Sequence, residues 1–117
     1  MSKKTVLPGN YMDYVPMKNP EYKWETNEKG RVVIDEPNEG FFNHIAQKFF
    51  RRPKVSHIQL DAYGSFVWLQ IDGKNTVYDI SELVQAEFGK KAEPLLNRLV
   101  EFFRILKFHH FIIYKND

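Results

Sequence analysis

The sequence predicts a small α+β domain of the winged-helix-like kind, and three patterns support this fold class. Apolar and polar side chains alternate over residues 22–36 and 54–60, which predicts an antiparallel hairpin and a third strand. Apolar residues recur at helical spacing between residues 62 and 107, which predicts a bundle of three helices. A short, strongly apolar stretch at 108–115 predicts a terminal strand or wing. Together these elements define the fold class.

The 117 residues suit a single domain that is large enough to bury a core. Residues 1–20 contain Pro8-Gly9, Val15-Pro16 and Asn19-Pro20, pairs that interrupt regular structure. We therefore expect a flexible N-terminal arm over residues 1–20 and one domain over residues 21–117.

The hairpin turn is expected at "NEKG", where Gly30 can take the positive φ that such turns need. An additional helix is expected at about 40–52, before the third strand. Phe42, Ile45 and Phe49 fall on one of its faces, and Pro53 ends it.

The three main helices carry recognisable start and stop signals. Asp61 is expected to cap a first helix over residues 62–71, and Asp72-Gly73 to end it. Thr76 and Asp79 resemble a capping box at the start of the second helix. Gly89 should end that helix, and Pro94 suits the first turn of a third helix that runs to about residue 107. The expected buried side chains of the last two helices are Val77, Ile80, Val84, Phe88, Leu95, Leu96, Leu99, Val100, Phe103 and Leu106.

The composition of the chain excludes several kinds of functional site. The absence of cysteine excludes disulfides, thiolate metal ligands and a cysteine nucleophile, and it fits a reducing cytoplasm, where we expect this protein to be located. The first residues lack the apolar stretch of a secretory signal, and no apolar run approaches the roughly 18 residues that span a bilayer. We therefore expect no membrane association.

The sequence offers little for catalysis. It contains no nucleotide-binding loop and no nucleophile motif. The adjacent His109 and His110 would point to opposite faces of a strand, so they cannot share a metal ion on one face. His44 and His57 belong to no metal-ligand pattern, and we expect neither a metal, a cofactor nor an enzyme.

DNA binding by the third helix is the alternative that a winged helix suggests. Its polar positions carry two acids and two arginines, which is poor provision for neutralising phosphates. These positions are Glu93, Asn97, Arg98, Glu101 and Arg104. A DNA-binding regulator therefore remains the second hypothesis, and nucleic acid is not the expected partner.

Positive charge is concentrated in "QKFFRRPK", a basic patch of Lys48, Arg51, Arg52 and Lys54. Interleaved aromatic and basic residues can bind single-stranded nucleic acid or an anionic membrane surface. They can equally form a solvated helix end that complements the helix dipole. An acidic protein or peptide partner is the third interpretation.

A peptide could bind by adding a strand to an open sheet edge, with apolar residues of a neighbouring helix providing specificity. The strand at 54–60 and the third helix could form such a groove. Phe102 lies off the main apolar stripe of that helix, beside Arg98 and Ile105. It would either face the groove or widen the core.

The stretch "VWLQIDGKNTVYDISELVQAEFG", followed by "LLNRLVEFFRIL", resembles the PqqD family, named for a protein of pyrroloquinoline-quinone biosynthesis. The resemblance covers roughly Tyr22 to Tyr114. The residues that carry it are Trp68, Asp72, Gly73, Thr76, Val77 and Ile80.

The resemblance implies a peptide-binding winged helix, also called a RiPP recognition element. Such a module holds the leader of a ribosomally made precursor peptide and presents it to a modifying enzyme, often a radical SAM enzyme. The peptide would lie beside the third strand and against the third helix. This places the expected peptide-binding residues at Val55, His57, Gln59, Arg98, Phe102 and Ile105. The helix at 40–52 departs from the family pattern as an insertion, and a homodimer is left open.

Overall fold

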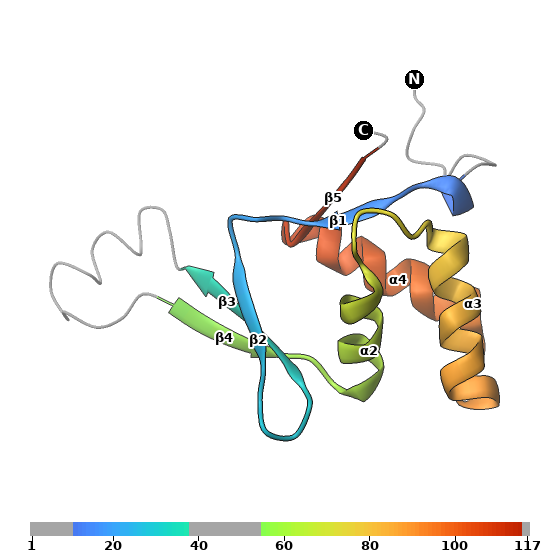
Figure 1. The fold of residues 1–117 in the computed structure, drawn as a ribbon, viewed down its shortest axis with the longest axis horizontal. Coiled ribbons are helices and arrows are strands. Elements are labelled where there is room, and N and C mark those ends of the chain that lie inside the picture. The colour runs from blue at the N-terminus through green and yellow to red at the C-terminus, as the bar shows by residue number, and fades with distance from the viewer. Residues whose placement is uncertain (1–10, 38–54, 116–117) are drawn as a thin grey trace, which may run out of the picture. The chain divides into compact units, whose positions relative to one another are not determined.

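The computed structural model of the protein describes residues 11–37 and 55–115. In these ranges the chain forms three α-helices and two small antiparallel sheets (Figure 1), which confirms the predicted α+β, winged-helix-like class. The elements are η1 (Tyr11–Asp13), β1 (Pro16–Lys18), β2 (Lys23–Thr26), β3 (Val32–Pro37), β4 (Val55–Gln59), α2 (Ala62–Gln70), α3 (Val77–Phe88), η2 (Gly89–Ala92), α4 (Leu95–Phe108) and β5 (Ile112–Tyr114). The helix expected at about 40–52 and the basic patch lie outside the described residues.

The chain divides into two units, which we describe separately. One unit comprises residues 20–65 and contains the three-stranded sheet β2–β3–β4. The other comprises the residues up to 19 together with those from 66 onward, and it contains most of α2, the helices α3 and α4, and the two-stranded sheet β1–β5.

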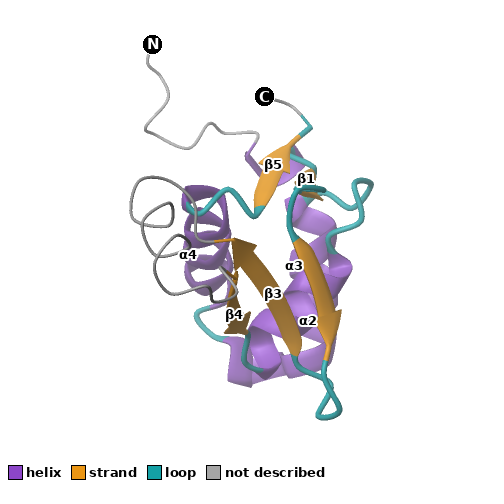
Figure 2. Ribbon diagram, turned by 90° about the vertical axis from the view of Figure 1, so that its left-hand side faces the viewer, coloured by secondary structure: helices purple, strands orange, loops and turns teal. Residues whose placement is uncertain are grey.

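The three-stranded sheet confirms the predicted hairpin and third strand (Figure 2). β2 pairs antiparallel with β3, with Trp24 opposite Ile34, and β3 pairs antiparallel with β4, with Ile34 opposite Ile58. Gly30 has φ +79°, as the predicted hairpin turn requires. Val32 and Ile34 on one face are fully buried, whereas Asp35 on the other face is only half-buried. The sheet therefore has one core face and one outer face.

A side chain from α2 completes this sheet. The Ser65 hydroxyl accepts a hydrogen bond from the Val32 backbone N–H at 2.8 Å, and it donates one to the Leu60 carbonyl at 3.2 Å. The carbonyl of Val32 in turn accepts from the Leu60 N–H at 2.8 Å. Ser65 is 3% exposed, so it satisfies a backbone donor that water does not reach. The sequence pattern did not indicate this role.

The two-stranded sheet joins parts of the chain that are far apart in sequence. β5 confirms a strand near the end of the chain, but a shorter one than the expected 108–115, because Phe108 belongs to α4 and His109 and His110 lie in the turn before β5 rather than on a strand. The partner of β5 is β1, with Pro16 opposite Tyr114 and Lys18 opposite Ile112. The Tyr11 and Tyr114 hydroxyls, 2.9 Å apart, link η1 to the same strand. The sequence pattern did not predict η1 or β1, because elements of three residues are too short to show a period.

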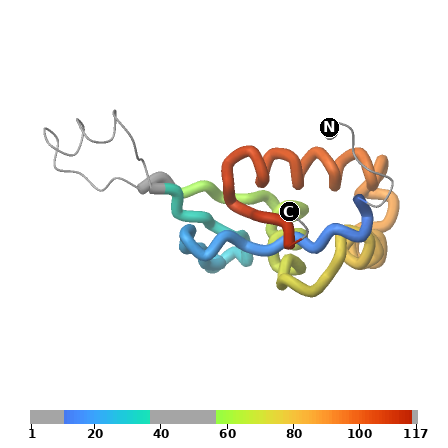
Figure 3. Tube along the Cα trace, turned by 90° about the horizontal axis from the view of Figure 1, so that it is seen from above, coloured from blue at the N-terminus to red at the C-terminus, as the bar shows by residue number. Residues whose placement is uncertain are grey.

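The helices begin and end where local signals place them. Asp61 accepts a hydrogen bond from the Gly64 N–H at 2.8 Å at the start of α2. Thr76 and Asp79 form a complete capping box on α3, with bonds of 3.0 and 2.9 Å. Gly89, with φ +55°, ends α3. Figure 3 follows the chain from α3 through η2 into α4.

The unit that contains α3 and α4, the helical unit, buries most of the apolar side chains expected in its core. Fully buried side chains come from all three helices and from β5: Val67, Trp68, Val77, Ile80, Val84, Leu99, Phe103, Leu106 and Ile112. Phe88, Leu95 and Val100 are half-buried. Leu96 was expected in the core but is 49% exposed. Residue 96 is nearly a right angle around the helix from residue 95, so it leaves the stripe that Leu95 and Leu99 share.

Two lysines hold the elbow between α2 and α3. The Lys18 ammonium donates to the Ile71 carbonyl, and the Lys115 ammonium donates to the Gly73 carbonyl at 2.9 Å. Lys18 also lies 5.5 Å from the centre of the Trp68 ring. Burial lowers the pKa of Lys18, although the nearby Asp72 carboxylate opposes that effect. The elbow is thus fixed by β1 and by the residue that follows β5.

Among the residues that the structure describes, no helix is long and apolar enough to cross a membrane. The same part of the chain contains no group of three or more histidine or acidic side chains that could hold a metal ion.

Candidate functional site

The strand half of the expected site is an edge strand. Within the described ranges, β4 pairs with β3 and lies at the end of the strand order β2–β3–β4. His57 and Gln59 have exposed side chains, and Ile58 between them is half-buried. Val55 begins the strand. His57 and Gln59 therefore lie on the outer face of the sheet, and Ile58 lies on the core face.

The ladder determines which backbone groups of β4 face the open edge. The Leu60 N–H donates to the Val32 carbonyl, so residues 60 and 32 form a hydrogen-bonded pair. In an antiparallel ladder such pairs alternate with non-hydrogen-bonded pairs. Ile58 is therefore hydrogen-bonded to Ile34, whereas the N–H and C=O groups of Val55, His57 and Gln59 point away from β3. These are the three strand residues that the sequence analysis assigned to peptide binding.

The outer face of β4 is polar and is held by its neighbours. Nδ1 of His57 lies 2.8 Å from Oδ1 of Asp35, the residue directly opposite it on β3. The side-chain oxygen of Gln59 accepts a hydrogen bond from the Asn27 amide at 3.0 Å. Sequence reasoning missed Asp35 and Asn27 as partners. Only the strand register could have indicated Asp35, because the pair is 22 residues apart in sequence.

The helix half of the expected site forms one face of α4. Arg98, Phe102 and Ile105 follow one another at i, i+4 and i+7, which places them on the same side of a helix. Ile105 is 47% exposed. Phe102 is half-buried and its ring centre lies 6.5 Å from that of Phe103, so it borders the core without being enclosed by it.

The arginines of α4 already have partners within the helical unit. Arg98 donates to the Lys91 carbonyl at 2.7 Å, and Arg104 lies 3.5 Å from Glu101. The contact with Glu101 offsets the charge of Arg104, whereas the contact of Arg98 with a neutral carbonyl leaves the charge of Arg98 in place. These contacts give no support to the DNA-binding alternative.

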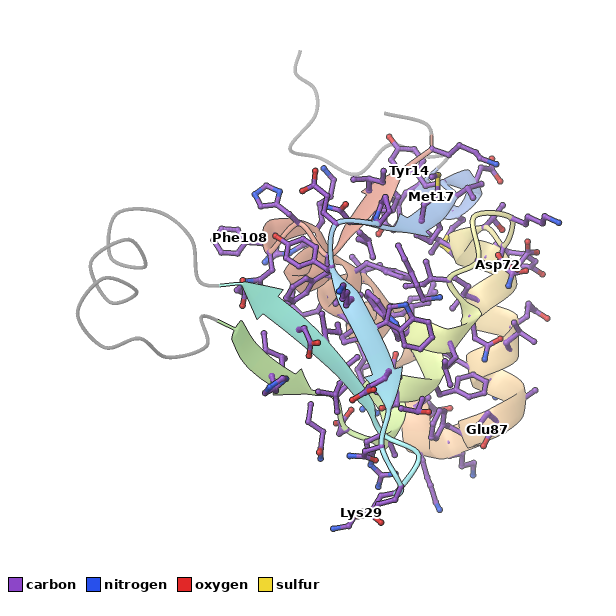
Figure 4. All side chains as sticks on the ribbon, turned by 60° about the vertical axis from the view of Figure 1, so that its left-hand side comes forward. Tyr14, Met17, Lys29, Asp72, Glu87 and Phe108 are labelled. Atoms are coloured by element: carbon purple, nitrogen blue, oxygen red, sulfur yellow. The ribbon has the colours of Figure 1, made fainter. Side chains whose placement is uncertain are left out.

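Phe108 was not among the predicted site residues, yet it is the most exposed large apolar side chain described, at 77% (Figure 4). Its ring packs edge-on against His109, with centres 5.3 Å apart, and His109 stacks on Phe111 at 5.7 Å. Sequence reasoning missed this exposure because it assigned Phe108 to the terminal strand, whereas Phe108 is the last residue of α4 and falls outside the apolar stripe of that helix. The strand residues of the expected site belong to one unit and the helix residues to the other. Each half of the site is therefore described by itself.

These features define a small α+β, winged-helix-like domain whose distinctive features are an open strand edge and an exposed helix face. The sequence profile of the family described as Coenzyme PQQ synthesis protein D (PqqD) matches residues 51–112, which is slightly more than half of the chain. The chain belongs to the PqqD family. No curated protein and no solved structure gives a significant match. Proteins of this family are accessory proteins without catalysis that act with a precursor peptide and a radical SAM enzyme.

Proposed function

We propose that this protein is a non-catalytic, peptide-binding adaptor. It would hold the leader of a ribosomally made precursor peptide and present it to a modifying enzyme of the radical SAM class. Membership of the PqqD family supports the class of partner. The observation that carries the proposal is the edge of β4, where the outward backbone groups belong to Val55, His57 and Gln59.

In the proposed mode the leader adds to β4 as an extended strand. Its backbone would exchange hydrogen bonds with the outward N–H and C=O groups, which recognise any sequence equally. Each such bond contributes only about 0.5–1.5 kcal/mol, so an edge of this length needs additional anchors. Selectivity must then come from side chains that contact the leader.

We assign the side-chain anchors to α4. Phe102 and Ile105 offer partly exposed apolar surface on one helix face, and Arg98 adds a charge for an acidic leader residue. The basic patch Lys48, Arg51, Arg52 and Lys54 is a second candidate contact for acidic residues, and it lies outside the described residues. Acidic residues are therefore expected in the leader beside apolar ones.

The edge-strand mode can be tested with a synthetic peptide, selected from a random library displayed on phage against the full chain. His57→Pro removes one outward N–H donor, and proline is tolerated where an edge-strand N–H faces solvent. His57→Ala is the matched control, because it loses the same imidazole and retains the donor. We expect His57→Pro to bind about tenfold more weakly than His57→Ala in calorimetry, which corresponds to one lost hydrogen bond. Equal affinities would contradict strand addition.

The helix contribution can be tested separately with Phe102→Ala and Arg98→Glu. Both should weaken the selected peptide while the circular dichroism spectrum stays unchanged. Leu96→Ala is the control, because it also truncates an apolar side chain of α4 but on another side of the helix. If all three variants bind alike, α4 is not part of the site.

The presentation role requires a second partner. The genes beside this one should encode a small peptide and a radical SAM enzyme, and the purified enzyme should bind the chain with its peptide. Tight binding to duplex DNA that weakens steeply between low and moderate salt would instead support the regulator and overturn the adaptor.

A further inference from the structure

The outer face of the three-stranded sheet carries a row of three titratable side chains. Lys23 on β2 lies directly opposite Asp35 on β3, and Asp35 lies directly opposite His57 on β4. Residues directly opposite each other in a sheet project from the same face. Nδ1 of His57 lies 2.8 Å from Oδ1 of Asp35. The row therefore runs from an ammonium group through a carboxylate to an imidazole on the edge strand β4.

The contact with Asp35 determines what the other ring nitrogen of His57 can do. An aspartate carboxylate only accepts hydrogen bonds, so Nδ1 of His57 carries the proton of this contact. In the neutral imidazole Nε2 is then an acceptor, and in the protonated imidazole it becomes a donor. Histidine side chains change between these two states from about pH 5 to 8. The His57 side chain is 68% exposed, so a ligand at this edge can reach it.

The other charged side chains of the three described strands lie farther from the edge or on the other face. Lys23 and Glu25 on β2 share the outer face, but β3 separates them from β4. Glu36 follows Asp35 on β3 and projects from the opposite face. Among these strands, the charge of Asp35 is therefore the one that acts on His57 directly.

Strand addition would bring one residue of the leader against His57. The N–H and C=O groups of His57 point away from β3, so an antiparallel leader forms a hydrogen-bonded pair with this residue. The two paired residues lie about 5.5 Å apart between Cα atoms, and their side chains share one face. A leader carboxylate at this position can accept a hydrogen bond from Nε2 only when the imidazole is protonated.

We propose that His57 selects a leader with an aspartate or glutamate at the position paired with it, and that this contact strengthens binding as the pH falls. This inference rests on the proposed function. In the bound state the imidazolium lies between two carboxylates, that of Asp35 and that of the leader. Charge-assisted hydrogen bonds of this kind are roughly twice as strong as neutral ones. When the imidazole is neutral, affinity depends on the backbone of β4 and on α4.

The test begins with peptides selected by the full chain from a random phage library at about pH 5.5 and, separately, at about pH 8. The pool selected at about pH 5.5 should be enriched in aspartate or glutamate at one position, and the other pool should not. Replacing that residue by its amide in a synthetic peptide should weaken binding about fivefold at the lower pH in calorimetry. At the higher pH the same replacement should have almost no effect.

Three variants separate the charge of His57 from other effects of pH. His57→Gln has no charge to titrate, so it should lose both the acidic preference and the gain in affinity at low pH. His57→Lys is charged at both pH values, so it should prefer the acidic peptide at both. His109→Gln is the matched control, because His109 is also exposed but belongs to the other unit. It should keep the pH dependence of the wild type.

The possible outcomes distinguish this inference from the proposed function. Peptides that bind His57→Pro more weakly than His57→Ala, yet show no acidic preference at either pH, would overturn the inference and leave strand addition in place. An acidic preference that His57→Gln retains would also overturn it, because the carboxylate would then bind elsewhere, such as at Arg98. A chain that selects no peptide at either pH would overturn the proposed function and this inference together.

Discussion

Oδ1 of Asp35 and Nδ1 of His57 lie 2.8 Å apart, and their residues occupy directly opposite positions on β3 and β4. The side chains are 34% and 68% exposed, so the pair lies on the outer face of the sheet. It is an ion pair only when the imidazole is protonated. The contact fixes the His57 side chain toward β3 and leaves the outward backbone of the same residue to an incoming strand.

We predict that Asp35→Asn lowers the free energy of unfolding by less than about 1 kcal/mol, because exposed ion pairs contribute about 0–1 kcal/mol. The amide oxygen can also still accept a hydrogen bond from the imidazole. Peptide affinity should change little, since the proposed contacts use the backbone of β4. Urea unfolding and calorimetry measure the two quantities. A loss of stability beyond about 2 kcal/mol would show that the pair contributes far more than its exposure suggests.

Replacing Ser65 should lower the free energy of unfolding more than replacing Asp35 does. Ser65→Ala leaves the buried Val32 N–H without its acceptor, and an unsatisfied buried donor costs about 1–3 kcal/mol. Ser81→Ala is the matched control, because Ser81 is also buried but its hydroxyl donates only to the Tyr78 carbonyl in its own helix. That bond is local and slightly unfavourable for a helix. Urea unfolding should show a clear loss for Ser65→Ala and almost none for Ser81→Ala.

The features that sequence predicted here are local ones. Thr76 and Asp79 are three residues apart, and both capping bonds form as expected. Gly30 in the hairpin and Asp61 before α2 behave in the same way. In each case the physical cause lies within one turn, so neighbouring residues suffice to predict it.

The features that sequence missed depend on distant partners. Pro16 meets Tyr114, and Val32 meets Ser65, through contacts that no short window contains. The same holds for the site. Periodicity placed His57 on an edge strand, but the strand register was needed to show which backbone groups point outward and that Asp35 is the side-chain partner. The joint use of β4 and α4 by one peptide remains a prediction.

The end of α4 contains a strained residue. His110 has φ +66°, and it occupies the turn in which the Phe111 N–H bonds to the Leu106 carbonyl at 2.9 Å and the His110 N–H to that of Lys107 at 3.0 Å. This is a Schellman motif, which usually places glycine at that position. The Asn19 side chain donates to the His110 carbonyl at 2.8 Å and helps to hold the conformation.

We predict that His110→Gly raises the free energy of unfolding by about 0.5–1 kcal/mol, because a left-handed conformation costs about 1–2 kcal/mol for a residue with a Cβ and glycine returns part of that in chain entropy. His110→Ala is the control, since it removes the ring but retains the Cβ. Thermal and urea unfolding should rank His110→Gly above both the wild type and His110→Ala. Equal stability of the two variants would mean that the imidazole, rather than the backbone, determines the effect.

Asp72 provides a prediction about pH. Its Oδ1 accepts hydrogen bonds from the backbone N–H groups of Asn75 and Lys74, each at 2.8 Å, at the elbow between α2 and α3. These bonds, with that from Asn75 the larger cause, lower the pKa of Asp72 below the ordinary value of 3.8. A carboxylate whose folded pKa is depressed stabilises the fold above its unfolded pKa, and this contribution disappears as the pH falls through the lower folded value.

Asp72→Asn retains an oxygen acceptor for both N–H groups but has no charge to titrate. The wild type should therefore be more stable than Asp72→Asn at neutral pH, and the difference should shrink once the pH drops below about 3.8. Urea unfolding of both proteins at a series of pH values measures this difference directly. A constant difference across the series would show that the hydrogen-bond geometry of the elbow, and not the charge on Asp72, stabilises this turn.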